Sequence, residues 1–532
     1  MALKSSSTAV CALLTIIIGF FCCQAAGQDV GARKGEFERK IRSKKQALQI
    51  EAIGIIETFG DPSGVDLLVK ALSKVSSDVD KTRQKYEKLG AKIRSEVAKR
   101  IDKRTRNNQV SVAAIEAAEA KIAPLRKEYD ELNKKLEDTE ELQERLLGAA
   151  DNLMRSVRDS LKGEAATKFV DHLGKQKKVL GRALFLRMLG TIDHPALAAC
   201  LAEIALNAKL PAERVAALSA LDYLVPKSAA TPGEQALNDE HWQVRLVAIS
   251  LLKKVKSPSS VGPLIARLEI EKGRLVTDII TALRKITGKN FHDNASLWQK
   301  WWASNKEGFD PESTYYDPEE DDVAKDKEGA YFFGIETRSK NIIYVLDISG
   351  SMLWALDAPN YQPGGNIPFP KNARTGKRRY DFAKKQLLQS IASLPKDGTF
   401  NIVYYNGEPK LWKKKMQVAT AANKAAVTKW AENLEPGGNT NIFDALEEAF
   451  ELIGRGSHDK AYKLAADTIY FLSDGRAYRG RITEPNQMLR EIHKMNSLRK
   501  VQIHSVSIGR SSDHKFMEKI AKQNDGKCVI KQ

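Results

Sequence analysis

The feature that most constrains the fold is an alternation of strand and helix patterns from residue 340 to the carboxyl terminus. Short apolar segments typical of buried strands are separated by amphipathic helical patterns. The strand segments read NIIYVLDIS, TFNIVYYNG, ADTIYFLSDG and VQIHSVSIG. This alternation predicts a doubly wound α/β domain with a largely parallel sheet and helices on both faces. Ligands of such folds bind at the carboxyl ends of the strands.

Polar side chains occupy those strand ends. The first strand ends in Asp347, followed by Ser349 and Ser351. The segment FLSDG ends in Asp474, and the loop PGGNTN between these strands carries Thr440. All-oxygen groups of this kind suit a hard divalent cation such as Mg²⁺ or Mn²⁺. With few charged ligands, the cation would stay positive enough to recruit a carboxylate of another molecule, which is a chemistry of adhesion.

Other kinds of site are disfavoured by what the carboxy-terminal segment lacks. Its strand ends carry no cysteine or neighbouring histidine, which argues against zinc or copper. It contains no GxSxG motif and no Walker loop. The histidines of the whole chain are scattered without a cluster. We therefore predict a non-catalytic protein, with a hydrolase of unrecognised site as the enzymatic alternative.

The segment 340–532 resembles a von Willebrand factor type A (vWA) domain. DISGSM resembles the DxSxS motif of the metal-ion-dependent adhesion site (MIDAS) of that family. NTNIFDAL resembles the threonine loop, and FLSDG resembles the last aspartate loop. The three motifs occur in the family's order, each on the expected loop, and the family has a Rossmann-like fold.

This resemblance implies roles for the five polar residues. Ser349 and Ser351 are expected to bind the ion directly, and Thr440 to bind it directly in the ligand-ready form. Asp347 and Asp474 are expected to act largely through water, or by direct contact when the site rearranges. The implied ion is Mg²⁺, or Mn²⁺ or Ca²⁺, and the implied partner is a protein that presents a carboxylate.

The sequence departs from the vWA pattern just after the serine motif. Residues 353–379 (LWALDAPNYQPGGNIPFPKNARTGKRR) form an unusually long insertion with a basic end. A surface insertion without a role is one interpretation. The other is a lid or specificity loop at the rim of the metal site that favours acidic partners. Its candidate partner-binding residues are Trp354, Tyr361, Lys377, Arg378 and Arg379.

The segments before residue 307 are predicted to be helical. In 38–75 and 176–306, an apolar helix repeatedly meets a proline-containing turn and a second apolar helix. Such pairs bury their faces by stacking, so we predict an α-helical solenoid that resembles HEAT repeats. An unrelated helical bundle is the alternative.

A highly charged insertion, residues 76–175, interrupts these repeats. Its apolar residues follow a 3-4 spacing, which predicts an antiparallel helical hairpin or one arm of a dimeric coiled coil. Within it, residues 81–106 hold eleven Lys or Arg against three acids. A solvated helix face explains this bias, and so does contact with an anionic polymer. We expect no nucleic acid partner, because no stacking-aromatic pattern accompanies the charge.

The amino terminus has the pattern of a signal peptide. Lys4 precedes the apolar run VCALLTIIIGFFCC, and small residues follow at 25–27. The run is short for a membrane span, so we predict cleavage, with an uncleaved anchor as the alternative. No later stretch is apolar enough to cross a membrane. The predicted location is therefore exported: periplasmic, cell envelope or secreted.

These patterns divide the chain and suggest a role. The predicted parts are a signal peptide (1–27), a HEAT-like pair (38–75), a charged hairpin or coiled coil (76–175), HEAT-like repeats (176–306), an acidic linker (307–339) and the vWA-like domain (340–532). We predict an exported adhesion protein whose metal site engages an acidic group of a partner. The alternative is an assembly scaffold or chaperone-like subunit in which the metal regulates docking.

Overall fold

The computed structural model resolves into two compact units, residues 1–201 and 202–532. The described residues are 30–106, 112–176, 179–224, 227–315, 330–358, 372–454, 464–474, 476–510 and 512–532. The predicted signal peptide lies outside them. Among the described residues, no helix is both long and apolar enough to span a membrane.

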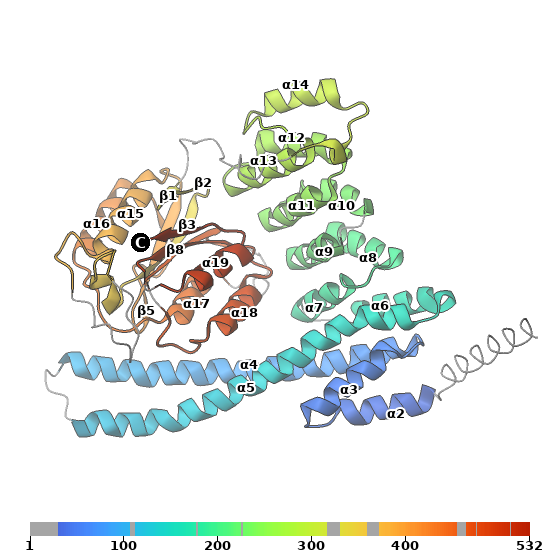
Figure 1. Cartoon of the computed structure of the whole chain (residues 1–532), viewed down its shortest axis with the longest axis horizontal. Helices are drawn as coiled ribbons and strands as arrows, with labels where there is room; N and C mark the ends of the chain where they lie inside the picture. Colours follow the sequence, from blue (N-terminus) through green and yellow to red (C-terminus); the bar gives the residue numbers. More distant parts are fainter. Residues whose placement is uncertain are drawn as a thin grey trace, which may run out of the picture. The chain divides into compact units, whose positions relative to one another are not determined.

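The first unit is helical. Its helices are α2 (Val30–Ile41), α3 (Gln46–Glu57), α4 (Ser63–Arg106), α5 (Val112–Ser156), α6 (Lys162–Lys175) and α7 (Val179–Leu189). The long helices α4 and α5 lie side by side (Figure 1). Gln143 donates a hydrogen bond to Ser76 at 2.8 Å, and the ring of Tyr86 stacks on that of Tyr129 with centroids 4.2 Å apart. These contacts show that the two helices run antiparallel.

The α4–α5 pair modifies one predicted boundary. Residue 76, where we placed the start of the charged insertion, lies inside α4, because its apolar face continues without a break from Val65 to Leu89. Supercoiling of the pair stays a prediction.

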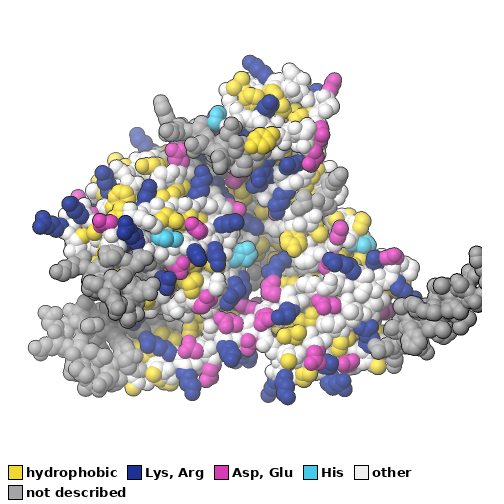
Figure 2. All heavy atoms as spheres, in the orientation of Figure 1, with side chains coloured by type: hydrophobic (Ala, Val, Ile, Leu, Met, Phe, Trp, Pro, Cys, Tyr) yellow, Lys and Arg dark blue, Asp and Glu magenta, His cyan; other side chains and the backbone are white. Residues whose placement is uncertain are grey.

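The basic part of α4 presents several of its charges to solvent. Lys81, Lys85, Lys88 and Lys92 are exposed, whereas Arg83 forms an ion pair with Glu140 of α5. Figure 2 shows Lys and Arg side chains dispersed over the visible face of the chain, with Asp and Glu among them. An anionic partner for this helix stays a prediction.

The second unit begins with more helices. After α8 (Pro195–Asn207) come α9 (Pro211–Leu224), α10 (Ala230–Ala236), α11 (Trp242–Val255), α12 (Val261–Ile270), α13 (Arg274–Thr287) and α14 (Ala295–Asn305). Helix α11 packs on both α9 and α13, and α12 packs on both α13 and α14.

One contact recurs along these helices. Arg214 pairs with Asp239 at 2.6 Å and also donates to the carbonyl of Ala208. Arg245 pairs in the same way with Glu271 at 2.8 Å and donates to the carbonyl of Asp239. Each arginine thus joins the turn before its own helix to a carboxylate that comes later in the chain. The recurrence indicates a repeated helical design, and its assignment as a HEAT-like solenoid stays a prediction.

The rest of the second unit is an α/β domain built on a mostly parallel sheet, as predicted. Its strands are β3 (Asn341–Asp347), β4 (Thr399–Tyr405), β5 (Pro409–Leu411), β6 (Gln417–Val418), β7 (Thr468–Ser473), β8 (Gln502–Ile508) and β9 (Cys528–Lys531). The order is β5-β4-β3-β7-β8-β9, and β6 also pairs with β4. Strands β3, β4, β7, β8 and β9 are parallel, whereas β5 and β6 run antiparallel to β4.

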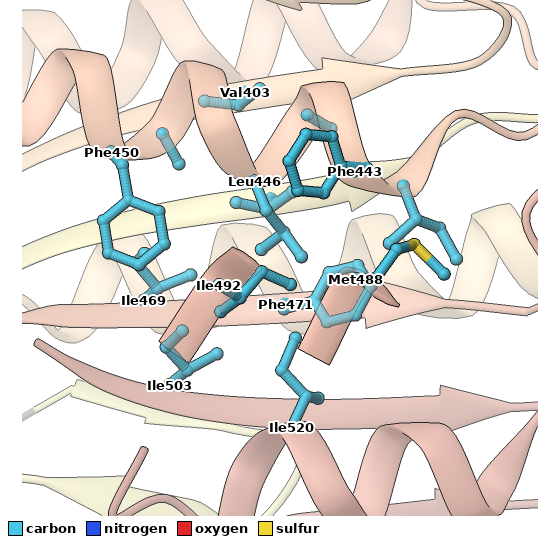
Figure 3. Close-up of a cluster of buried hydrophobic side chains, with 14 of the residues drawn as sticks. Val403, Phe443, Leu446, Phe450, Ile469, Phe471, Met488, Ile492, Ile503 and Ile520 are labelled. Carbon is cyan, nitrogen blue, oxygen red and sulfur yellow. The ribbon is translucent and has the colours of Figure 1, made fainter. Parts of the chain in front are cut away.

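Helices cover both faces of this sheet. They are α15 (Arg379–Ser393), α16 (Ala421–Glu432), α17 (Ile442–Ile453), α18 (Pro485–Asn496) and α19 (His514–Gln523). Side chains of α17, α18 and α19, among them Phe450 and Ile492, meet Phe471 of β7 on one face (Figure 3). On the other face, Leu387 of α15 and Val427 of α16 belong to a separate cluster of buried apolar side chains. Full burial of each large apolar side chain contributes roughly 1.5–3 kcal/mol.

The α/β domain begins earlier than residue 340, which corrects the predicted linker. Strands β1 (Ala330–Phe332) and β2 (Ile335–Thr337) form an antiparallel hairpin. The ring of Phe332 is buried and packs edge-on against Tyr344, at 5.6 Å between centroids. The acidic composition of 307–339 obscured this short apolar hairpin, so the linker ends before residue 330.

A buried histidine makes the stability of this domain depend on pH. His504 of β8 stacks on Tyr470, and its Nδ1 accepts a hydrogen bond from the Lys527 amide at 3.0 Å. Burial lowers the pKa of His504 from 6.5 to about 3, and the positive charges of Arg274 and Lys527 act in the same direction. The imidazole is therefore neutral in the folded state, with Nδ1 unprotonated.

Acidification is expected to destabilise the protein through His504. Below pH 6.5 His504 binds a proton in the unfolded chain, whereas in the folded chain it binds one only near pH 3. Within that window the free energy of unfolding falls by up to about 1.4 kcal/mol per pH unit. His504→Gln, measured by thermal unfolding at pH 7 and pH 4.5, should reduce this fall. His194→Gln is the control, and an equal fall in both variants would contradict the prediction.

Candidate functional site

The carboxyl end of β3 places Asp347 at the centre of the sheet edge. β3 lies between β4 and β7, and Asp347 is in register with Tyr405 of β4. Its carboxylate is fully buried and accepts three hydrogen bonds. The donors are the Ser349 amide at 2.8 Å, the Ser473 hydroxyl at 2.9 Å and the Tyr405 hydroxyl at 3.3 Å. These contacts fix the orientation of Asp347 from both neighbouring strands.

The two serines of the DISGS motif follow in a tight turn. Ser349 is buried, and its hydroxyl lies 3.2 Å from the Ser351 hydroxyl. Ser351 in turn donates to Oδ1 of Asp474 at 2.8 Å. Because Asp474 directly follows β7, this contact connects the ends of two adjacent parallel strands. The structure thus brings together four of the five predicted residues through direct contacts: Asp347, Ser349, Ser351 and Asp474.

The loop that carries Thr440 packs against the same turn. The Gly437 amide donates to the carbonyl of Ile348 at 2.8 Å, and the Gly350 amide donates to the carbonyl of Gly438 at 3.0 Å. Thr440 is buried, and its carbonyl accepts from the amides of Tyr478 and Arg479. The Thr440 loop is therefore held between the serine turn and the loop that follows β7.

Two buried carboxyls in one site raise each other's affinity for protons. Burial raises the pKa of Asp347, and the charge of Asp474 raises it further. Burial also raises the pKa of Asp474, whereas the guanidinium of Arg379 opposes that rise. Arg379 supplies one positive charge next to these carboxyls, through its ion pair with Asp474.

The insertion 353–379 differs in part from the expectation. Its two ends are joined, since the Ala373 amide donates to the carbonyl of Leu353 at 2.8 Å and Ala355 pairs with Arg378 in an antiparallel bridge. Closed ends explain how the domain accommodates a long insertion. Tyr361, one of the predicted partner contacts, lies outside the described residues.

Two other predicted partner contacts are interior residues, which is a correction. Trp354 is 5% exposed and Arg379 is fully buried, with Nη1 of Arg379 donating to Oδ2 of Asp474 at 3.1 Å. The run of basic residues in the sequence predicted an exposed position for Arg379. Its side chain is instead buried, because it forms an ion pair with the buried carboxylate of Asp474. Lys377 is exposed, and Arg378 forms an ion pair with Asp381 at 2.9 Å. Partner binding by these two residues stays a prediction.

Sequence reasoning missed three residues that support the site. Tyr405 and Ser473 hold Asp347, and Arg379 holds Asp474. Both hydroxyl donors end strands that flank β3, so their alignment with Asp347 was available from the strand patterns. The role of Arg379 had no signal beyond its charge.

The donor set fits a hard divalent cation. Within the described residues, no group of three or more His, Cys, Asp or Glu could hold a metal. The oxygens at this edge are instead two carboxylates and neighbouring hydroxyls, whose ordinary partners are Mg²⁺, Mn²⁺ and Ca²⁺. This chemistry is compatible with the ions predicted above.

Comparison with known families decides the fold assignment. The family model described as von Willebrand factor type A domain matches residues 373–530. This chain contains a vWA domain. The matched range includes Thr440 and Asp474, and the DISGS motif lies before it.

The vWA domain is similar to part of several larger proteins. Inter-alpha-trypsin inhibitor heavy chain H1 of Mesocricetus auratus is 25% identical over 203 residues, which is 37% of this chain and 19% of that protein. Heavy chain H3 of Homo sapiens is 22% identical over 195 residues, 36% of this chain and 19% of that protein. The alignments thus span about a fifth of the length of these relatives.

Two of the solved structures that match this chain cover a similar share of it. A von Willebrand factor type A protein from Catenulispora acidiphila has 18% identity and a TM-score of 0.28, covering 37% of this chain and 40% of that one. The manganese-loaded TRAP protein of Plasmodium vivax has 14% identity and a TM-score of 0.24, covering 35% and 64%.

Proposed function

We propose that this is an exported, non-catalytic interaction protein whose vWA domain uses a divalent cation to bind a carboxylate of a protein partner. Ser349, Ser351 and Thr440 would hold the cation, with Asp347 and Asp474 acting from behind them. When bound, a cation such as Mg²⁺ or Mn²⁺ supplies an open coordination position for an acidic group.

The observation that carries this proposal is the convergence of three loops on one edge of the sheet. The serine turn, the Thr440 loop and the end of β7 are joined by hydrogen bonds between Ser351 and Asp474 and between Gly350 and Gly438. Asp347 is oriented by hydrogen bonds from the hydroxyls of Ser473 and Tyr405. Such a site is suited to holding a ligand.

The proposed location is the periplasm, the cell envelope or the extracellular space. It rests on the signal-like amino terminus, whose apolar run is short for a membrane span. An exported protein would meet partners and divalent cations in the same compartment. The identity of the captured partner distinguishes adhesion from assembly. A partner in assembly would be another subunit of a complex that contains this chain, whereas a partner in adhesion would not.

A pulldown with matched variants tests the proposal. The purified chain should retain its partners in Mg²⁺ and lose them in EDTA, and Asp347→Ala should lose them in both conditions. Asp397→Ala is the control, because Asp397 lies in the same domain, has a side chain that is 69% exposed and pairs with Lys340 at 2.9 Å. Retention of the same partners by Asp347→Ala and in EDTA would contradict the mechanism.

A further inference from the structure

Arg379 is built into the carboxyl edge of the sheet beside the proposed metal site. It is the first residue of α15, and its side chain is fully buried. Nη1 donates to Oδ2 of Asp474 at 3.1 Å, and Nε donates to the carbonyl of Ala355 at 3.1 Å. The guanidinium also lies over the ring of Trp354, 5.3 Å from the centroid. These contacts hold the buried guanidinium, and with it the positive charge, at a fixed position beside Asp474.

The end of β8 leaves room for that guanidinium. Gly509 follows β8 with a φ of +79°, and a Cβ at this position would lie 2.4 Å from Cζ of Arg379. Any larger residue would therefore collide with the guanidinium or displace it. The compartment that holds Arg379 is formed by three separate parts of the chain. These are the insertion, with Trp354 and Ala355, the residue after β7, Asp474, and the residue after β8, Gly509.

The charge of this compartment bears directly on the two binding events proposed above. With both carboxyls ionised, Asp347, Asp474 and Arg379 together carry one negative charge, whereas the two aspartates alone carry two. A nearby positive charge weakens the attraction for a cation and strengthens the attraction of the loaded site for an anion. In a buried site this influence is stronger than at a solvated surface.

From this geometry we propose that Arg379 is a positioning residue. It lowers the affinity of the site for the divalent cation and raises the affinity of the loaded site for a carboxylate. It holds Asp474 through an internal ion pair, so the divalent cation is bound less tightly and keeps more positive charge toward the partner. The insertion 353–379 would thus act on the site from inside through its last residue. This inference rests on the proposed function, because it concerns the same cation and the same carboxylate.

The test uses the full chain and Mn²⁺ as the probe. Free Mn²⁺ is measured by electron paramagnetic resonance to obtain its affinity, and acetate is then titrated into the Mn²⁺-saturated chain while water proton relaxation is followed. Arg379→Met should raise Mn²⁺ affinity by about tenfold, the size expected for removal of one nearby charge. The same variant should weaken acetate binding severalfold.

Two further variants separate charge from structure. Arg379→Lys keeps the charge and should bind Mn²⁺ within about threefold of the wild-type chain. Arg245→Met removes an arginine whose side chain is 11% exposed and pairs with Glu271 in the helical region, and it should change neither affinity. If Arg379→Met does not fold, Gly509→Ala provides the alternative, because it displaces the guanidinium and should raise Mn²⁺ affinity in the same direction.

Opposite changes in the two affinities support the proposal. A parallel loss of Mn²⁺ and acetate affinity in Arg379→Met would overturn it, since that is the result of a purely structural role. Unchanged Mn²⁺ affinity would overturn it as well. Absence of Mn²⁺ binding by the wild-type chain would instead refute the proposed function on which the inference rests.

Discussion

Replacing Gly526 with alanine is expected to cause a large loss of stability, about 3 kcal/mol or more. Gly526 lies in the turn between α19 and β9, where a Cβ would be 1.9 Å from the carbonyl oxygen of Ile503. That oxygen belongs to the backbone of β8, an interior strand paired with β7 and β9. Neither atom can move without separating strands, so the strain exceeds that of ordinary overpacking. Scanning calorimetry should show a transition lowered by roughly 6–12 °C.

A glycine with free space is the matched control for Gly526→Ala. Nothing lies within 4 Å of a Cβ built on Gly163 in α6. Gly163→Ala should therefore leave the melting temperature equal or slightly higher, because alanine lowers the entropy of the unfolded chain. A Gly526→Ala variant that melts within 1 °C of the wild-type protein would show that the turn can rearrange at little cost.

The sheet and the gathering of the site loops followed from the sequence because their determinants are local. Buried parallel strands are continuous apolar runs, and NIIYVLD and TIYFLS have that pattern. Once the strands are parallel, their carboxyl ends share one edge. The contact between Ser351 and Asp474 is therefore a consequence of topology, although 123 positions separate the two residues.

The interior contacts of Arg379 could not be predicted in this way. Arg379 stands in a run of three basic residues, which in most sequences marks a solvated surface. Its burial depends on Asp474, on the ring of Trp354 and on space beside Gly509, all distant in sequence. Contacts between residues that are distant in sequence depend on tertiary packing, so the local sequence around Arg379 does not predict them.

Short elements were missed for a related reason. The hairpin of β1 and β2 has only three residues in each strand, too few to show a period. Its apolar residues follow an acidic run, and composition therefore indicated a linker. The boundary at residue 76 failed because one amphipathic face passes without interruption through α4.

The largest loss of cation affinity short of removing a carboxylate is expected from the hydroxyl ligands. Ser349→Ala and Thr440→Val each remove one oxygen from a buried position while nearly preserving side-chain volume. Loss of residues that merely support a metal ligand typically lowers affinity 10–100-fold, so loss of a direct ligand should cost about 100-fold or more. Isothermal titration of each EDTA-treated variant with Mn²⁺ measures the change.

Ser390→Ala is the control that separates the metal site from general effects of losing a buried hydroxyl. Ser390 is fully buried in α15, and its hydroxyl lies 2.7 Å from that of Tyr344, within the core of the same domain. Its removal should cost about 1 kcal/mol of stability with Mn²⁺ affinity unchanged. Ser349→Ala and Thr440→Val should show the reverse, a near-normal melting temperature without cation and little added stabilisation by Mn²⁺. Equal Mn²⁺ affinity in all three variants would mean that these hydroxyls serve only to close the turns, and that the cation, if bound, is held elsewhere.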